Sequence, residues 1–310
     1  MLTIFLASIL TLVQLNCENL FDCSHDEGKN DTEFTAEGKR HWTKQKYWQK
    51  TENIAKELMG CCGKDTLPDL ITLCEVENDS VMERLTRRTA LGRLGYRYIM
   101  TNSRDERGID VALLYRMVAF MPICQRVITP DDNYHAHPLR DILYVCGRTP
   151  SNDTLHVVIV HAPSKFGSAK KSEKRRLTVI NKIIETIDSV RTNNQEAKII
   201  ISGDFNDTAE STSMLSLENN EIINVTKTTK GYNGAKGSYK YKGRWESIDH
   251  ILVSPSIVNN ILESRIYDAS YLIEEDNKYG GVRPRRSYKG LRFDPYGHSD
   301  HLPIILKVNI

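Results

Sequence analysis

The sequence predicts an α/β protein folded as one domain, and two repeated patterns indicate this class. Short apolar runs recur along the chain, many of them β-branched and closed by polar residues or by Gly and Pro, which is typical of buried strands. Longer segments between them repeat apolar residues at helical spacing. Strands interleaved with helices indicate sheets whose faces are covered by helices.

Eight strands and three helices are predicted, in chain order. The predicted strands span residues 13–15, 70–73, 111–115, 142–146, 155–160, 199–202, 248–253 and 302–308. The predicted helices span residues 42–59, 80–94 and 170–190, and Gly95 marks the end of the second. Polar, loop-like stretches lie at 22–41 and 274–298, but each has strand signals on both sides. We therefore predict a single domain over residues 13–310.

The composition agrees with a globular domain. Of the 310 residues, 40% are hydrophobic and 26% are charged, which excludes collagen, coiled coils, bulk disorder and multi-span membrane proteins. The 42 Lys and Arg residues nearly balance the 40 Asp and Glu residues. The resulting net charge of +2 gives no general sign of nucleic-acid binding, although local basic patches could still bind phosphate.

Residues 1–12 form an apolar lead-in for which two interpretations stay open. The run is too short to span a bilayer, which needs about 20 apolar residues. Its length suits the core of a secretory signal peptide, but no Lys or Arg precedes Lys29, whereas such peptides usually begin with positive charge. We expect a secreted or periplasmic protein if the segment is a truncated signal peptide, and a cytoplasmic protein otherwise.

The cysteines fix neither a metal site nor a compartment. There are seven, none in a Cys-x-x-Cys pair, so their spacing does not suggest zinc. A chain of this size does not need disulfides for stability. We expect buried thiols, with room for one bridge.

Polar residues at the ends of the apolar runs are the most informative pattern. An unpaired buried charge is costly, so buried strands rarely end in charged clusters without a reason. These residues are Asn16, Glu18, Glu75, His161, Asp204, Asn206, Asp249, His250, Asp300 and His301. Asn16 and Glu18 are two positions apart and are therefore expected on one strand face.

Each of these positions also has an ordinary structural interpretation. Taken alone, Glu75 could be a solvated strand end, His161 a core histidine and Asp204 a turn former. The strand ends of an α/β sheet meet at one edge, however, where so many carboxylates would repel one another without a cation or a phosphoryl group. Oxygen ligands with few thiols favour Mg²⁺, Mn²⁺ or Ca²⁺ over zinc. A phosphate-ester substrate fits such a metal, and a histidine paired with a carboxylate can hold a phosphate oxygen or pass a proton.

Seven motifs appear in a fixed order from about residue 13 to the C-terminus. They are Asn-x-Glu-Asn-Leu-Phe-Asp, Leu-Cys-Glu-Val-Glu-Asn, Arg-Gly-Ile-Asp-Val-Ala-Leu-Leu-Tyr-Arg, His-Ala-Pro-Ser, Gly-Asp-Phe-Asn-Asp, Ile-Asp-His-Ile-Leu and Ser-Asp-His-Leu-Pro. This set resembles the endonuclease/exonuclease/phosphatase superfamily, which has the DNase I-like fold. The resemblance implies a four-layered α/β sandwich, in which two mostly antiparallel β-sheets pack face to face with helices on the outside. It also implies an active site at one edge of the sandwich.

The resemblance further implies roles for individual residues. Glu75 matches the family's main metal-binding glutamate, and Glu18 stands where many relatives carry Asp. The implied metal-site residues are Asn16, Glu18, Glu75 and Asp300. The implied catalytic residues are His161, Asp204, Asn206, Asp249 and His301, with Asp249 holding His301. Which histidine serves as acid and which as base stays open.

Basic residues near this predicted site bear on the substrate. We predict phosphate contacts for Arg107, Arg175 and Arg176, while a solvated helix face is the other interpretation of residues 170–176. We expect a metal-dependent phosphodiesterase or nuclease that acts as a monomer without stable membrane insertion. An enzyme acting on a small or lipid phosphate ester is the alternative, and a non-catalytic binding module is the third hypothesis.

Overall fold

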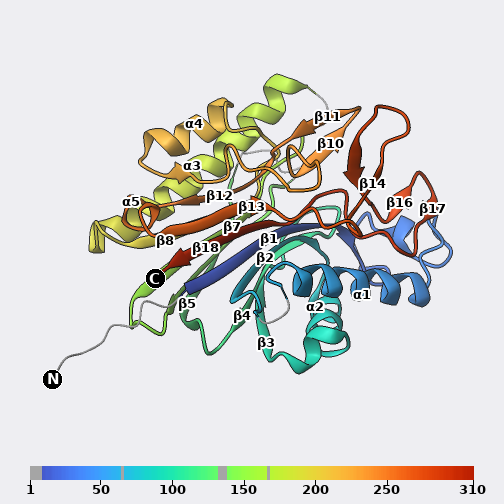
Figure 1. Cartoon of the computed structure of the whole chain (residues 1–310), viewed down its shortest axis with the longest axis horizontal. Coiled ribbons are helices and arrows are strands. Elements are labelled where there is room, and N and C mark those ends of the chain that lie inside the picture. Colours follow the sequence, from blue (N-terminus) through green and yellow to red (C-terminus); the bar gives the residue numbers. More distant parts are fainter. Residues whose placement is uncertain (1–8, 64–65, 132–137, 166–167) are drawn as a thin grey trace.

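The computed structural model describes residues 9–63, 66–131, 138–165 and 168–310. Two six-stranded sheets packed face to face form its centre (Figure 1). Each sheet contains one parallel strand pair, and all its other neighbouring strands run antiparallel. The predicted sandwich of two mostly antiparallel sheets is therefore confirmed.

The strand order differs between the two sheets. The first sheet has the order β13 (Ile261–Ile266), β18 (Ile304–Asn309), β1 (Ile9–Leu20), β2 (Leu70–Val76), β4 (Asp110–Arg116) and β3 (Tyr96–Met100). The second has the order β5 (Met121–Ile128), β6 (Ile142–Arg148), β7 (Thr154–His161), β8 (Lys198–Asp204), β12 (Asp249–Val253) and β9 (Ile223–Asn224). The parallel pairs are β1 with β2 and β7 with β8, and both lie in the middle of their sheets.

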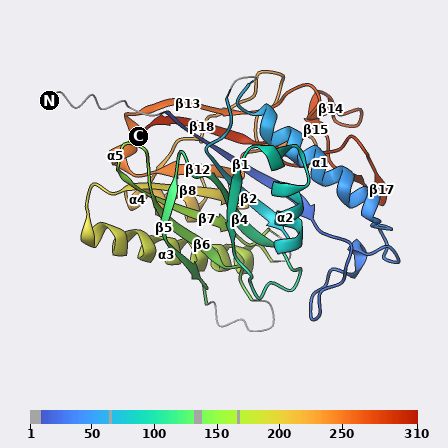
Figure 2. The same ribbon diagram turned by 90° about the horizontal axis from the view of Figure 1, so that it is seen from below.

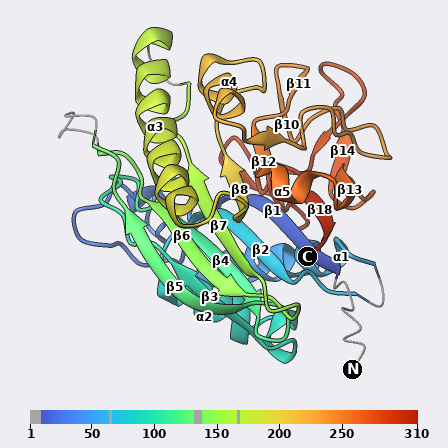
Figure 3. The ribbon, with the colours of Figure 1, turned by 90° about the vertical axis from the view of Figure 1, so that its left-hand side faces the viewer.

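Helices cover the outer face of each sheet. The helices are α1 (Lys44–Gly60), α2 (Asp79–Arg87), α3 (Ala169–Asn193), α4 (Thr212–Asn219) and the short α5 (Pro255–Val258), with 3-10 turns at Thr32–Phe34 and Ala90–Arg93. Figures 2 and 3 show α1 and α2 outside the first sheet and α3 and α4 outside the second. The chain thus forms the four layers that the resemblance implied.

Strand alternation explains how three hydrophobic layers form. On β1, Leu10 and Leu12 pack in the cluster between the sheets, whereas Val13 and Leu15 pack in the outer cluster with α1 and α2. Successive strand residues point to opposite faces, so a strand buried on both sides needs an unbroken apolar run. This is why the central strands were visible in the sequence.

All eight predicted strands are present, and the strands that the sequence concealed lie at sheet edges or in small hairpins. The edge strands β3, β5 and β13 lack long buried runs; β5 is mostly exposed along its length. The small hairpins are β10 (Tyr239–Tyr241) with β11 (Arg244–Glu246), β14 (Ile273–Glu275) with β15 (Val282–Pro284), and β16 (Tyr288–Lys289) with β17 (Arg292–Phe293). The first of these hairpins turns at Lys242 and Gly243.

Three further expectations can be placed on the structure. The first strand begins at Ile9, so the predicted boundary at residue 13 falls inside β1, while residues 1–8 lie outside the described part of the chain. The predicted helix at 80–94 is divided into α2 and a 3-10 turn. One disulfide joins Cys124 to Cys146 across β5 and β6, and five other cysteines are free.

In the described ranges, no helix combines the length and apolar character needed to cross a bilayer.

Candidate active site

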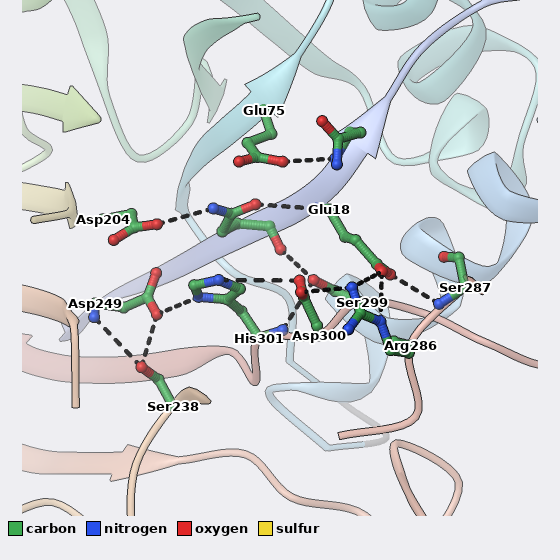
Figure 4. A network of polar contacts seen from close by, with 12 residues as sticks. Glu18, Glu75, Asp204, Ser238, Asp249, Arg286, Ser287, Ser299, Asp300 and His301 are labelled. Atoms are coloured by element: carbon green, nitrogen blue, oxygen red, sulfur yellow. Dashed lines mark hydrogen bonds and ion pairs between the residues drawn. The ribbon is translucent and has the colours of Figure 1, made fainter. Parts of the chain in front are cut away.

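The parallel strand pairs end at one edge of the sandwich, where polar side chains collect (Figure 4). In the second sheet, Asp204 lies opposite His161 on one side and opposite Asp249 on the other. Residues opposite each other on neighbouring strands project to the same face, so these three side chains form a row. Asn16 of the first sheet donates its Nδ2 to Asp204 Oδ2 at 2.9 Å and so connects the two sheets at this edge.

Left-handed backbone at the strand ends changes the direction of the side chains. Glu75 has φ 60°, while Glu18 and Asn19 have φ 51° and 55°. The register between β1 and β2 jumps here from Asn16–Cys74 to Leu20–Val76, which makes a bulge. Bulges and left-handed residues of this kind are concentrated at functional sites. The simple alternation assumed for Asn16 and Glu18 therefore does not continue through this region.

Asp204 is fixed by hydrogen bonds at both oxygens. Asn16 Nδ2 donates to Oδ2, and the backbone N–H of Asn206 donates to Oδ1 at 2.8 Å. The Asn206 amide in turn donates to the Ala162 carbonyl at 3.0 Å. Burial, followed by the nearby Asp249 charge, raises the pKa of Asp204. This carboxylate is therefore a good candidate to accept a proton.

The glycine of the Gly-Asp-Phe-Asn motif permits this arrangement. A Cβ on Gly203 would lie 1.9 Å from the Val160 carbonyl oxygen, so no other residue fits without moving β7 and β8 apart. The close packing of these strands is what keeps His161 and Asp204 in register.

His301 and Asp249 form a buried charged pair. The distance from His301 Nδ1 to Asp249 Oδ2 is 2.7 Å, and the Ser238 hydroxyl donates to the same oxygen at 2.6 Å. The Tyr239 ring packs against the imidazole with a centroid separation of 4.8 Å. Burial opposes the charge on His301, but the carboxylate of Asp249 prevails and raises the pKa of His301 well above its ordinary value.

His161 lies in the opposite electrostatic environment. Its Nε2 is 3.7 Å from Asp204 Oδ2 and 3.8 Å from Glu75 Oε1, while its Nδ1 has no hydrogen-bond partner among the described residues. Burial, followed by the charges of Arg140 and Arg107, lowers the pKa of His161 well below its ordinary value. Burial would raise the pKa of Glu75, but the two arginines and His301 lower it, so Glu75 is ionised beside a neutral imidazole.

Glu18 binds protein groups with both carboxylate oxygens. Arg286 Nε donates to Oε1 at 3.0 Å, and the backbone N–H of Ser287 donates to Oε2 at 2.7 Å. The Arg286 guanidinium also reaches Asp300 Oδ2 at 3.0 Å, and Lys50 Nζ donates to the Glu18 carbonyl. Burial and the Asp300 charge raise the pKa of Glu18 to about 6, although Lys50 and Arg286 oppose this shift.

These contacts bear on the predicted metal ligands. Asn16 uses its Oδ1 for the Glu18 N–H at 2.9 Å and its Nδ2 for Asp204. Glu18 anchors the segment that contains Arg286 and Ser287. Direct metal ligation by Asn16 and Glu18 stays a prediction, because both side chains are engaged in holding other parts of the site.

The remaining donors fit a hard divalent cation. Asp204, Asp249 and His301 each place one ligand atom within 4.8 Å of the others, and Asp249 Oδ1 has no hydrogen-bond partner in the described ranges. Because its pKa is raised, His301 is protonated in this group and serves as a hydrogen-bond donor, so the carboxylates are the donors available to a metal ion. Glu75 accepts the Asn19 N–H at Oε2 with a distance of 2.8 Å, and its Oε1 faces the site. Carboxylate-rich donor sets suit Mg²⁺, Mn²⁺ or Ca²⁺.

The three predicted phosphate-binding arginines lie in different environments. Arg107 is half-exposed, with its Nη2 3.7 Å from Glu75 Oε1. Arg176 is buried on α3, where its Nε pairs with Asp207 Oδ2 at 2.6 Å and an Nη1 donates to the Pro163 carbonyl at 3.3 Å. Arg175 is half-buried on the same helix. A phosphate contact by Arg175 or Arg176 stays a prediction, and Arg176 has a clear role in fastening α3 to the loop after β8.

Sequence reasoning missed several residues that shape this site. Arg140 has its Nη1 3.4 Å from the His161 carbonyl oxygen, and its Nε pairs with Asp105 at 3.3 Å. No motif marks Arg140, which precedes an ordinary strand. Arg286 lies in the loop-like stretch 274–298, and only the fold shows that its guanidinium reaches the site. Ser238 and Lys50 had no sequence signal.

Comparisons with known proteins identify the family of the chain. A sequence profile described as Endonuclease/Exonuclease/phosphatase family matches residues 11–310. No curated protein sequence matches the chain.

Solved structures show the same fold. An endonuclease/exonuclease/phosphatase from Bacteroides vulgatus is similar with TM-score 0.63 and 14% identity, covering 98% of this chain and 99% of that one. The mannosyl-6-phosphatase of Bacteroides thetaiotaomicron has TM-score 0.61 and 15% identity, with 97% and 100% covered. TDP2 of D. rerio, complexed with a single strand DNA product, has TM-score 0.59 and 14% identity, with 98% and 100% covered.

The sequence profile covers almost the whole chain, including every motif at the polar edge. This match supports hydrolysis of phosphate esters as the chemistry of the site. We conclude that the chain belongs to the endonuclease/exonuclease/phosphatase family.

Proposed function

We propose that this protein is a divalent-metal-dependent phosphodiesterase that hydrolyses phosphate esters by attack of water. The observation that carries this proposal is the row of His161, Asp204 and Asp249 on three neighbouring strands, with His301 bound to Asp249 at 2.7 Å and Glu75 facing the row. A proton acceptor, a cationic imidazole and a metal-binding carboxylate thus meet at one buried edge.

Glu75 and Asp300 would hold the metal ion. Glu75 Oε1 has no hydrogen bond among the described residues, and Asp300 uses Oδ2 for Arg286 while Oδ1 lies 3.9 Å from His301 Nε2. Mg²⁺ usually takes one or two carboxylates and completes its shell with water and substrate phosphate. We favour Mg²⁺, with Mn²⁺ or Ca²⁺ as alternatives; the bound ion supplies charge neutralisation at the phosphoryl oxygens.

The protein's own residues position and deprotonate the attacking water. Asp204, whose orientation is fixed by Asn16 and by the Asn206 N–H, accepts the proton. The Asn206 side chain is held by the Ala162 carbonyl next to His161. Neutral His161 borders the same oxygen of Asp204 and keeps this side of the site able to accept hydrogen bonds.

His301 acts on the developing negative charge. Asp249 stabilises its imidazolium form, so the ring donates hydrogen bonds rather than accepting them. We assign His301 to the phosphoryl or leaving-group oxygen, and His161 to the side of the attacking water. This assignment is our proposal for the two roles that the sequence left open.

A phosphodiester is the favoured substrate, and a phosphomonoester is the second candidate. Arg107 and Arg286 are each about half-exposed, at 45% and 44%, and both contact carboxylates of the site. Two such arginines also suit the doubly charged terminal phosphate of a small molecule. The DNA product bound by the D. rerio protein and the sugar phosphatase of B. thetaiotaomicron mirror these two possibilities.

The first test compares substrates and metals. Bis-p-nitrophenyl phosphate, p-nitrophenyl phosphate and single-stranded DNA are incubated with wild type in Mg²⁺, Mn²⁺, Ca²⁺ or EDTA. We expect metal-dependent cleavage that Glu75→Gln lowers by at least ~100-fold.

Glu196→Gln provides the matched control, because it makes the same chemical change on an exposed turn. Relative rates on the two nitrophenyl esters separate diesterase from monoesterase. Cleavage that persists in EDTA or in Glu75→Gln would contradict the proposal, and no cleavage of any substrate would favour a binding module.

A further inference from the structure

A second group of carboxylates lies outside the proposed active site, at the far side of the bulge in β1. Asp26 and Asp31 come from the loop after β1, and Glu77 follows the end of β2. One ligand atom from each lies within 4.8 Å of the others. Asp31 and Glu77 are deeply buried, with 1% and 5% of their surface exposed.

One oxygen of this group has no partner. Glu77 Oε2 accepts the Asp22 backbone N–H at 2.6 Å, but Glu77 Oε1 is shielded from solvent and has no hydrogen-bond partner in the described part of the chain. A buried carboxylate oxygen without a partner is costly, since it has lost its hydration and received nothing in return. The orphaned oxygen belongs to the carboxylate that faces Asp26 and Asp31.

Nearby positive charge does not compensate for the three carboxylates. His25 Nδ1 contacts Asp31 Oδ1, and among the described residues this ring is the basic side chain in contact with the group. Lys29 is close in sequence, but its Nζ donates to the Ser103 and Asp105 carbonyls, each at 2.9 Å. The backbone N–H of Asp26 supplies one hydrogen bond to Asp31 Oδ2 at 2.8 Å.

A cavity adjoins two members of the group. A cavity of about 520 Å³ is lined by Asp26 and Glu77, together with Asp79, Asp110 and other polar residues. It is large enough to hold the water molecules that complete the coordination of a hard cation.

We propose that Asp26, Asp31 and Glu77 form a second divalent-cation site, separate from the catalytic one, and that its ion is Ca²⁺. Three carboxylates with added water match the six to eight oxygen ligands of Ca²⁺, whereas Mg²⁺ usually takes only one or two carboxylates. The site does not depend on the proposed hydrolytic function.

An ion here ties the loop after β1 to the end of β2. Asn19 lies near the end of β1, just before this loop. Its N–H donates to Glu75 Oε2 at 2.8 Å, and its side chain contacts Arg107. Fixing this loop therefore stabilises the fold close to the active site, and the principal effect is on thermal stability.

The test measures ion binding and unfolding, not activity. The full chain is stripped with a chelator and titrated with CaCl₂ or MgCl₂ by calorimetry, and its Tm is followed in parallel. Wild type should bind Ca²⁺ with a rise in Tm. Glu77→Gln should lose this rise and at least ~10-fold in the affinity of one Ca²⁺-binding step. Glu75→Gln removes a ligand of the proposed catalytic ion and should keep this step and its Tm rise.

Asp79→Asn is the matched control, since Asp79 lines the same cavity but lies outside the group. If Glu77→Gln does not fold, the half-buried Asp26→Asn replaces it with the same expectation. The second site would be overturned if Glu77→Gln and Asp26→Asn kept the Ca²⁺-dependent rise in Tm. It would also be overturned if Glu75→Gln alone abolished that rise.

Discussion

His161 and His301 are both buried in the candidate active site, yet their rings differ in protonation. On the side of His301, the imidazole is bound to Asp249 at 2.7 Å, and its pKa is raised in spite of burial. On the side of His161, burial and the charges of Arg140 and Arg107 lower the pKa. One ring is a cation and the other is neutral.

This difference shows that the ionisation of a site histidine is decided by its neighbours. Burial alone would make both rings neutral, because it disfavours the charged form. Only the ring with a carboxylate in direct contact keeps its proton. The protonated His301 can therefore donate hydrogen bonds on one side of Asp204, and the neutral His161 can accept one on the other side.

Removal of the cationic ring should have the largest effect. His301→Ala should lower turnover by at least ~100-fold, since it deletes a charged hydrogen-bond donor to the phosphoryl group. Steady-state rates measure this loss, and circular dichroism confirms that the variant is folded. Turnover like that of wild type would remove His301 from the mechanism.

Asp249→Asn should make His301 resemble His161, with a lowered pKa and a neutral ring. The carboxylate raises the pKa of His301, so its loss lowers that pKa, and the active protonated form disappears at a lower pH. The alkaline limb of the rate profile should move to lower pH, with about tenfold less activity for each pKa unit below the assay pH. An alkaline limb that does not move would show that His301 does not need its charge.

Arg107 and Arg176 separate substrate binding from support of the fold. Arg107→Ala should raise KM by about tenfold, the scale of one charged hydrogen bond to phosphate. Arg176→Ala should leave KM unchanged but lower the free energy of unfolding by about 3 kcal/mol, because the buried Asp207 carboxylate loses its arginine partner and keeps only the Ser213 hydroxyl and a distant Lys165. Kinetics and denaturant unfolding of both variants check this contrast, and a raised KM in Arg176→Ala would assign that arginine to the substrate after all.

Loss of a charge on the His161 side should have the smallest effect. Arg140→Gln should raise the pKa of His161, because the arginine lowers it. The acidic limb of the rate profile should then move to higher pH, with little change in alkaline solution where His161 is neutral in both proteins. Histidine titration by NMR measures the pKa directly, and Arg140→Lys, which keeps the charge, should resemble wild type.

The sequence was most informative where strands are buried on both faces. The run before Asp204 and the run before His161 are continuous apolar segments, and both became central strands ending in the site. Edge strands such as β5 were missed because exposure removes the apolar signal. The motif residues Asp204, Asp249 and His301 were found together because each follows or opens a buried strand.

The sequence alone determined the core strands, the sandwich class and the polar edge. Strands buried on both faces need continuous apolar runs, so they can be recognised along the chain. Polar residues at the ends of these runs are costly to bury, and they therefore mark the site. Only the tertiary structure decided which charges meet. It joined Glu18 to Arg286 over a separation of 268 residues and placed the Arg140 guanidinium against the His161 carbonyl. Left-handed backbone at Glu18 and Glu75 broke the alternation from which side-chain direction is read. Electrostatic effects act through space, so the protonation of each histidine could not be read from spacing along the chain.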